Sequence, residues 1–112
     1  MQKLCDLTCQ ACRGGVPPLT GSQIQPLHDQ VSDWDVVNEH HLARTFKFRD
    51  FVEALAFVNR VGEVAETQGH HPNIHLTWGR VHIEIHTHKI DGLTESDFIL
   101  AARIDALDTG PD

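Results

Sequence analysis

The sequence predicts an α+β domain with two layers, in which helices pack on one face of a four-stranded antiparallel sheet. Two observations lead to this fold class. Short segments with strand-like alternation come in two pairs, each pair with a turn between its members, and segments with helical spacing precede, separate and follow these pairs. Neighbouring short strands form antiparallel hairpins, and helices cover the apolar face of such a sheet. The expected order is therefore helix, two strands, helix, two strands, helix.

The length of 112 residues predicts a single folding unit. We divide the chain into an N-terminal arm, residues 1–19, and one domain, residues 20–112. The arm contains three cysteines, a double glycine and a double proline without sustained periodicity, which is typical of a loop rather than of a core element. The domain begins at Thr20-Gly21-Ser22-Gln23, which has the spacing of an N-capping box and opens a short helix to about Gln30.

The first hairpin follows this helix. The segments Trp34 to Asn38 and Leu42 to Phe48 are predicted strands around a polar turn. Leu42, Phe46 and Phe48 are separated by even numbers of positions, so they share one face of their strand.

The strongest helical pattern begins after Asp50, a good N-cap, and runs to about Gln68. Gly69 fits the position after the last turn, and Pro72 disfavours helical angles at the residue before it. His70 and His71 are therefore expected just beyond the helix C-terminus. Apolar and small residues recur within the helix at spacings of four and three, which predicts this core-facing stripe: Phe51, Leu55, Val58, Gly62 and Ala65.

The second hairpin and the last helix complete the pattern. Apolar residues alternate from Ile74 to Trp78, Gly79 provides a tight turn, and alternation resumes from Val81 to Thr87. Asp91-Gly92 ends this hairpin. Thr94-Glu95-Ser96-Asp97 then resembles a capping box, with Asp in place of Glu or Gln, and opens a helix to about Leu107.

Charge and composition argue against several classes of function. Sixteen Asp and Glu against nine Lys and Arg give a net charge of −7, which repels the phosphates of nucleic acids. The apolar runs are much shorter than the about 20 residues that cross a bilayer. The N-terminus lacks the basic and apolar stretches of a secretory signal. We therefore expect a cytoplasmic protein with reduced thiols and with neither a membrane nor a nucleic-acid partner.

Histidine is the unusual residue of this chain. There are nine, and six of them lie between His70 and His88. Histidine titrates near neutral pH and is the commonest metal ligand, so this segment is where function is expected. In Glu66-x-x-x-His70-His71-Pro72, the helix macrodipole and the upstream carboxylate favour His70 as an acid. The alternative is that both rings are solvated capping residues.

A second motif, His82-x-Glu84-x-His86-x-His88, has two interpretations. Alternate residues of a strand point to one side, so these four side chains form either the polar outer face of the sheet or a metal site. His88 differs because it lies at the strand end, before the helix that begins near Asp97. Asp97 itself is either a functional carboxylate or only a helix cap.

A third motif lies in the arm. Its three cysteines have the spacing found in radical enzymes that use S-adenosylmethionine, but those enzymes need a barrel, for which 112 residues are too few. Zinc with a histidine as fourth ligand and an arm of inert thiols both stay open for these residues: Cys5, Cys9 and Cys12.

The second half of the chain contains the run Glu66-x-x-x-His70-His71-Pro72, followed by Thr87-His88 and Asp97. This run resembles the signature of the pterin-4a-carbinolamine dehydratase family. The resemblance extends upstream to the arm, which is similar to that of bacterial members, and nearly the whole chain is covered. The family's fold agrees with the order of elements above. One departure is Asp91, where a small residue is common. The residues that carry the resemblance are Glu66-x-x-x-His70-His71-Pro72, Trp78, Val81, Thr87-His88, Gly92-Leu93-Thr94 and Asp97, with Cys9, Cys12, Pro18, Leu19, Trp34, Phe46 to Phe48, Asp50-Phe51 and Phe57 upstream.

The resemblance implies dehydration of 4a-hydroxytetrahydropterin, the product of an aromatic amino-acid hydroxylase, to quinonoid dihydropterin and water in tetrahydropterin recycling. No metal or cofactor is implied, because two imidazoles can transfer the protons near neutral pH. The implied catalytic residues are His70 and His88 as the proton-transferring pair and His71 as a positioning group. We expect Asp97 to orient His88, Glu66 to tune His70, and Thr87 and Trp34 to bind the substrate.

Two other functions stay open at this point. One is a metal-dependent enzyme that uses the strand motif from His82 to His88. The other is a dimerisation partner of a transcription factor, a role that animal relatives have. The resemblance also implies a homodimer or a homotetramer, without deciding between them or identifying the physiological pterin.

Overall fold

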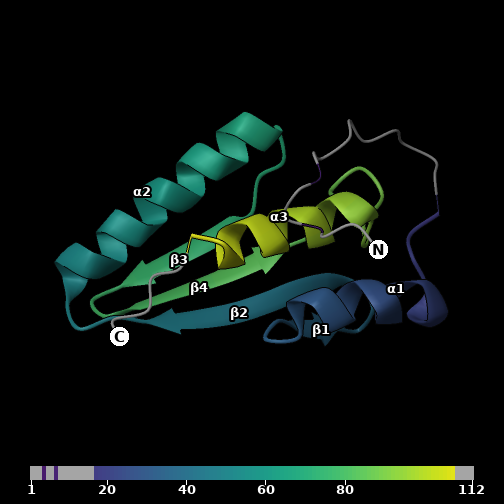
Figure 1. The fold of residues 1–112 in the computed structure, drawn as a ribbon, viewed down its shortest axis with the longest axis horizontal. Helices are drawn as coiled ribbons and strands as arrows, with labels where there is room; N and C mark the ends of the chain where they lie inside the picture. Colours follow the sequence, from purple (N-terminus) through teal and green to yellow (C-terminus); the bar gives the residue numbers. More distant parts are fainter. Residues whose placement is uncertain (1–3, 5–6, 8–16, 108–112) are drawn as a thin grey trace.

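The structure is a computed structural model that describes residues 4, 7 and 17–107. Within these residues the elements follow the expected order, with one turn of 3-10 helix added after the first helix (Figure 1). The elements are α1 (Gly21–His28), η2 (Asp29–Val31), β1 (Asp35–Val37), β2 (His41–Lys47), α2 (Phe51–Gln68), β3 (Asn73–Thr77), β4 (Arg80–Ile85) and α3 (Glu95–Asp105).

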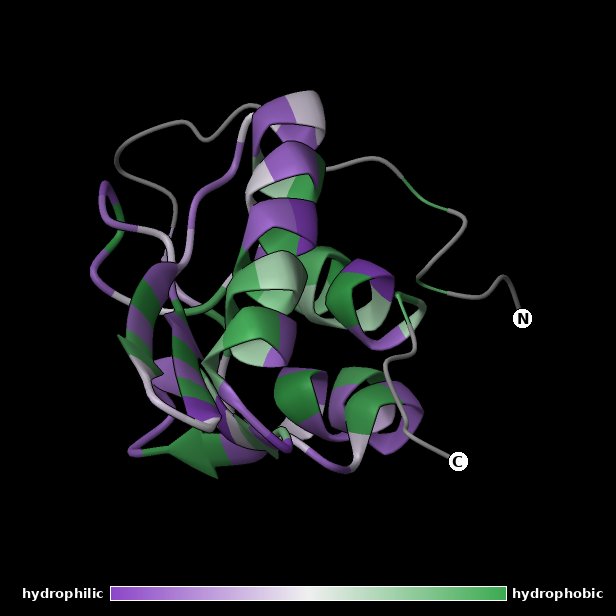
Figure 2. Ribbon diagram, turned by 90° about the vertical axis from the view of Figure 1, so that its left-hand side faces the viewer, coloured by the Kyte–Doolittle hydropathy of each residue, from purple (hydrophilic) through white to green (hydrophobic). Residues whose placement is uncertain are grey.

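The strands form one antiparallel sheet in the order β1-β2-β4-β3. Each hairpin pairs its own two strands, and the hairpins join through β2 and β4, where Leu42 lies opposite Ile85 and Phe46 opposite Val81. The three α-helices of the described residues lie on one side of this sheet, as Figure 2 shows. The predicted α+β class, with helices on one face of a four-stranded sheet, is confirmed.

The core lies between the sheet and the helices. On β4, Val81, Ile83 and Ile85 have no exposed surface, whereas His82 and Glu84 alternate with them and are half-buried on the open face. α3 packs against α1, α2, β2 and β4, and nearly all of its residues are buried. Full burial of each large apolar side chain stabilises the fold by about 1.5 to 3 kcal/mol. This packing holds the first turn of α3 firmly in place.

α2 begins after Asp50 and ends before Gly69, as expected, but it buries a different stripe. Phe51 and Leu55 remain 43% and 41% exposed. The predicted stripe was wrong for these two residues, whereas Ala65 is buried and Val58 is partly buried against the core. The helix is apolar over a wide arc, and spacing alone does not decide which part of the arc faces the sheet. The buried residues of α2 are Ala54, Phe57, Val61 and Ala65.

No helix in the described part of the chain combines the length and apolarity needed to cross a membrane.

Leu4, Leu7 and Leu19 of the N-terminal arm pack against the domain, whereas the sequence predicted a loop outside the core. Leu4 is buried, and its N–H donates to Oε1 of Gln30 at 3.0 Å. The carbonyl of Leu7 accepts hydrogen bonds from the guanidinium of Arg103 on α3. The cysteines for which zinc and inert thiols were the alternatives lie outside the described residues: Cys5, Cys9 and Cys12.

Candidate active site

The C-terminus of α2 turns His70 toward α3. Gly69 has a φ of 66°, in the left-handed region that glycine adopts without a steric penalty. The N–H of Gly69 donates to the carbonyl of Glu66, and the N–H of His70 donates to that of Ala65. His70 therefore leaves the helix axis, and its side chain is only 13% exposed.

Asp97, in the first turn of α3, holds the His70 ring. Its Oδ1 lies 2.5 Å from Nε2 of His70, and its side chain is fully buried. Its Oδ2 accepts the backbone N–H of Thr94 and the hydroxyl of Thr87, each at 2.8 Å. The carboxylate is therefore the helix cap and the partner of His70 at the same time. A buried carboxylate with both oxygens engaged is fixed in orientation, and so is the ring that it holds.

This contact determines which nitrogen of His70 can act on a ligand. A carboxylate only accepts hydrogen bonds, so Nε2 of His70 carries the proton that it donates to Asp97. In the neutral ring the lone pair then lies on Nδ1, which can take a proton from a ligand, while the negative charge of Asp97 lies beside the ring that becomes positive. A buried carboxylate that orients an imidazole in this way is typical of general acid–base sites.

His71 forms a second, exposed pair. Its Nε2 lies 2.5 Å from Oε2 of Glu66, and the two side chains are 59% and 79% exposed. The expected partners were different, since Glu66 was assigned to His70 and Asp97 to His88. Gly69, whose backbone is in the left-handed conformation, explains the difference, because the turn at this residue directs His70 away from Glu66 and toward α3.

His88 lies on a loop that closes beside Asp97. The N–H of Thr87 donates to the carbonyl of Gly92 at 2.8 Å, and the two residues form an isolated antiparallel bridge. The hydroxyl of Thr87 contacts Asp97, so His88 is one residue from the network that holds His70. His88 is exposed, and its ring centroid lies 4.2 Å from that of His86. The end of α2 and the segment between β4 and α3 thus meet at the N-terminus of α3.

Comparison with known proteins assigns the chain to a family. Residues 17–107 match the model of the family described as pterin 4 alpha carbinolamine dehydratase. The chain belongs to this family. A protein of Rubrobacter xylanophilus that carries the name "Putative pterin-4-alpha-carbinolamine dehydratase" is 58% identical over 107 residues, which cover 96% of this chain and 100% of the relative. The resemblance seen in the sequence is confirmed.

Two solved structures also resemble this member of the dehydratase family. A structure described as transcriptional coactivator/pterin dehydratase from Brucella melitensis has a TM-score of 0.75 at 31% identity, covering 80% of this chain and 97% of its own. A pterin dehydratase-like protein, described as a RuBisCO assembly factor in the alpha-carboxysome, has a TM-score of 0.58 at 27% identity, covering 67% and 88%. Because these descriptions name different roles for one fold, the residues of the site must carry the chemical argument.

Two residues that were expected to bind the dehydratase substrate are buried. Trp34 has no exposed surface, and its indole N–H donates to Oδ1 of Asp105 at 2.8 Å. Thr87 is 2% exposed, and its hydroxyl contacts Asp97 and Thr94. Neither side chain has appreciable exposed surface in this arrangement, and direct substrate contact stays a prediction for both. Trp34 supports the core, and Thr87 positions Asp97.

The metal site considered for the strand motif is not assembled as the spacing suggested. Nε2 of His82 lies 3.2 Å from Glu84, and its Nδ1 lies 2.8 Å from the hydroxyl of Thr45. β4 ends at Ile85, but His86 and His88 still flank the buried Thr87, and their ring centroids lie 4.2 Å apart. Among the described residues, the group of side chains arranged to hold a metal ion includes only His86 of that motif.

The sequence interpretation missed a cluster of histidine rings at the end of the sheet, which we call the His40 cluster: His40, His41, His86 and His88. Ring centroids are 5.3 Å apart for the first two residues and 4.8 Å apart for His40 and His86. The register of β2 and β4 brings the rings together, since His41 precedes and His86 follows the paired residues Leu42 and Ile85 at one end of the sheet. Detecting the cluster required knowing that the hairpins join through these two strands.

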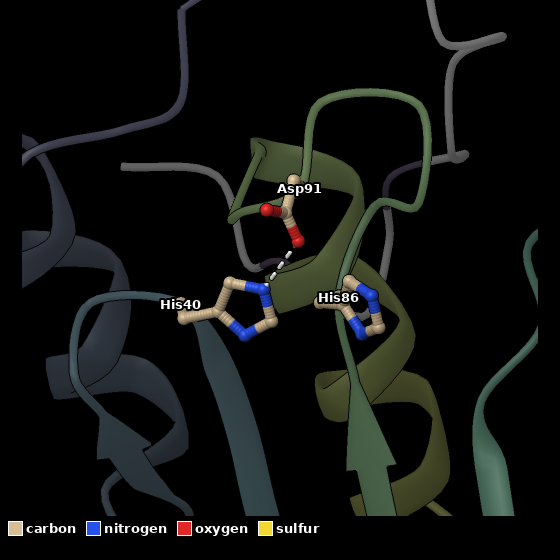
Figure 3. A group of neighbouring side chains, drawn as sticks. All are labelled: His40, His86 and Asp91. Atoms are coloured by element: carbon tan, nitrogen blue, oxygen red, sulfur yellow. Dashed lines mark hydrogen bonds and ion pairs between the residues drawn. The ribbon is translucent and has the colours of Figure 1, made fainter.

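The surroundings of the His40 cluster shift two pKa values. Burial, and then the nearby rings of His88 and His40, lowers the pKa of His86, whereas the charge of Asp97 acts in the opposite direction. The cluster therefore borders the His70–Asp97 pair. Nε2 of His40 lies 2.8 Å from Oδ1 of Asp91, and this hydrogen bond lowers the pKa of the Asp91 carboxyl (Figure 3).

A hollow in the surface lies elsewhere, between the C-terminal parts of α2 and α3. Glu63, Thr67, Arg103 and Leu107 are among the residues that line it, and none of the histidines does. Because concavity alone does not define an active site, we assign the site to the histidines near the start of α3, where a buried carboxylate orients an imidazole.

Proposed function

We propose that the chain is a hydro-lyase that converts 4a-hydroxytetrahydropterin to quinonoid dihydropterin and water by histidine acid–base catalysis. The observation that carries this proposal is the buried Asp97, which holds Nε2 of His70 and leaves Nδ1 as the ring nitrogen that can accept a proton. Membership of the dehydratase family, and the 58% identity to a relative of that name, support the choice of substrate. The proposed context is tetrahydropterin recycling in the cytoplasm.

The reaction requires two proton transfers. The C4a–O bond breaks and hydroxide is a poor leaving group, so the oxygen must gain a proton and leave as water. The N5–H bond breaks as the C4a=N5 double bond forms, so N5 must lose a proton. Positioned imidazoles perform both transfers near neutral pH, and each contributes about 10² to 10⁴ in rate.

The geometry favours a division of roles among the three histidines. His70 is the base for N5, because its Nε2 proton is committed to Asp97 and Nδ1 is left to accept a proton. The exposed His88 is the acid for the leaving oxygen. His71, fixed by Glu66, positions the flat pterin ring. This division differs from the acid role that was expected for His70, because the contact with Asp97 occupies the Nε2 proton and leaves Nδ1 to accept one.

Substitution of single histidines tests the proposal. We expect His70→Ala and His88→Ala each to lose most of the turnover of chemically generated carbinolamine, followed by ultraviolet absorbance. His75→Ala is the matched control, because His75 is an exposed histidine on β3 whose ring neighbour is His82 rather than a proposed catalytic residue. Circular dichroism of each variant verifies that the fold is retained. Full activity in His70→Ala or His88→Ala, or an equal loss in His75→Ala, would contradict the proposal.

The proposal includes a homo-oligomer. Phe51, Val52 and Leu55 at the start of α2 are 43%, 75% and 41% exposed, and Trp78 is 69% exposed. Large apolar side chains on a protein surface favour association, and a homodimer or a homotetramer would cover them. Sedimentation of the full chain, compared with Val52→Lys, measures this state. A monomeric wild-type chain would contradict the oligomer while leaving the dehydratase proposal in place.

A further inference from the structure

We propose that His40, His86 and Asp91 form a binding site for a divalent transition-metal ion, with Zn²⁺ as the probe ion. The site lies beside the proposed catalytic histidines but uses other residues. It does not depend on the dehydratase proposal, because zinc binding is measured without pterin and without turnover.

The three side chains converge from different parts of the chain, as Figure 3 shows. His40 precedes β2, His86 follows β4, and Asp91 lies on the loop that leads to α3. Each residue offers one ligand atom, and these atoms all lie within 4.8 Å of one another. Oδ1 of Asp91 and Nε2 of His40 are already 2.8 Å apart.

Turns with positive φ values, which are uncommon for residues other than glycine, position two of the three ligands, His40 and Asp91. Asp91 has a φ of 56°, and its N–H donates to the carbonyls of Thr87 and His88. Asn38 and Glu39, just before His40, have φ values of 54° and 56° and form a tight turn. The approach of His40 to Asp91 is therefore built into two ordered turns rather than being a chance contact of long side chains.

The donor set suits Zn²⁺, an ion between hard and soft that accepts both nitrogen and oxygen ligands. Two imidazole nitrogens and one carboxylate oxygen bind zinc at about 2.0 to 2.2 Å, so ligand atoms around a tetrahedral ion lie about 3.3 Å apart. The atoms of this site need to close by about 1.5 Å at most from their present separation to reach that geometry. The side chain of Asp91 is 86% exposed and can rotate to make this adjustment. Water completes the coordination.

A neighbouring ring supports the site in the way that outer residues support metal ligands. Nδ1 of His41 lies 3.1 Å from Nδ1 of His40, so the second nitrogen of the His40 ring is engaged and the ring orientation is fixed. A cation that accepts the lone pairs of His40 and His86 also balances the negative charge of Asp91.

The test measures zinc binding in a background that removes the three cysteines of the arm, which could themselves bind zinc. The full chain with Cys5→Ser, Cys9→Ser and Cys12→Ser is titrated with Zn²⁺ by calorimetry at pH 7.5 and without pterin. We expect one ion per chain. His40→Gln and His86→Gln, made in this background, should each weaken binding by at least about tenfold, since each removes one of three protein ligands.

Two further variants keep the test independent of folding defects. Asp91→Asn should weaken binding by a similar factor while the fold is kept, because Asn tolerates a positive φ well and the side chain is largely exposed. His75→Gln is the matched control, since it removes an exposed histidine outside the site, and it should bind zinc as the background does. The proposal is overturned if the background binds no zinc, if His40→Gln and His86→Gln bind as tightly as the background, or if His75→Gln weakens binding equally.

Discussion

Replacing Asp97 separates its two roles, the cap of α3 and the partner of His70. In Asp97→Asn, the amide oxygen can take the place of Oδ2 and accept from Thr94 and Thr87, as the carboxylate does at 2.8 Å. The amide NH₂ then faces His70 and donates to it, so the ring must present Nε2 as an acceptor and carry its proton on Nδ1. The base is thereby lost while the helix cap is kept.

The structure gives the expected magnitudes. Asp97→Asn replaces one charge-assisted hydrogen bond, which is worth about 1.5 to 3 kcal/mol, by a neutral one of about 1 kcal/mol. The free energy of unfolding should therefore fall by about 1 to 2 kcal/mol. Asp97→Ala leaves three donors at a fully buried position without their acceptor and should cost about 3 to 5 kcal/mol. In both variants kcat should fall by about 10² to 10⁴, because the imidazole is no longer held as the correct tautomer.

Urea unfolding and carbinolamine turnover on the same preparations provide the assay. We expect the two variants to differ clearly in stability but to be similarly impaired in kcat. In Asp97→Asn, KM should change less than kcat does. A purely structural Asp97 would give the opposite result, in which the well-folded Asp97→Asn variant turns over substrate like the wild type. That outcome would refute the orienting role of Asp97.

Two further predictions concern the buried Trp34 and the titration of His86. Trp34→Phe removes the hydrogen bond to Asp105, whose carboxyl has a pKa raised by burial. The free energy of unfolding should therefore fall by about 1 to 2 kcal/mol, while KM stays unchanged. An increased KM with normal stability would instead indicate that Trp34 contacts the substrate. Because the folded chain lowers the pKa of His86 from its ordinary value of 6.5, the unfolded chain binds more protons there, and stability should be lost as pH falls through 6.5 toward the folded pKa. His86→Gln should reduce this slope in urea unfolding measured from pH 7.5 down to 5, whereas a steeper slope would contradict the direction of the shift.

The order of elements was predictable because local signals mark it. Capping boxes begin at Thr20 and Thr94, Asp50 caps α2, and Gly69 ends it, and all four act through neighbouring residues. Alternation on β4 also predicted its buried face. The stripe of α2 was not predictable in the same way, since several apolar arcs of this helix satisfy helical spacing.

The partners within the site were the least predictable feature. His70 and Asp97 are 27 residues apart, and their contact depends on how α2 crosses α3. The spacing of Glu66 and His70 suggested a pair one turn apart, but the left-handed backbone of Gly69 directs the His70 ring elsewhere. His40 was missed for a related reason, because it meets Asp91 across 51 residues through a strand order that local patterns do not determine.

Turnover after chelation tests the central claim most directly. The full chain is treated with EDTA, passed through a desalting column, and mixed with freshly generated carbinolamine in EDTA-containing buffer while ultraviolet absorbance is followed. If imidazoles carry the protons, the treated chain should accelerate dehydration as strongly as the untreated chain, whether or not zinc occupies the site at His40. Loss of the acceleration on chelation, with recovery when metal is returned, would contradict the account.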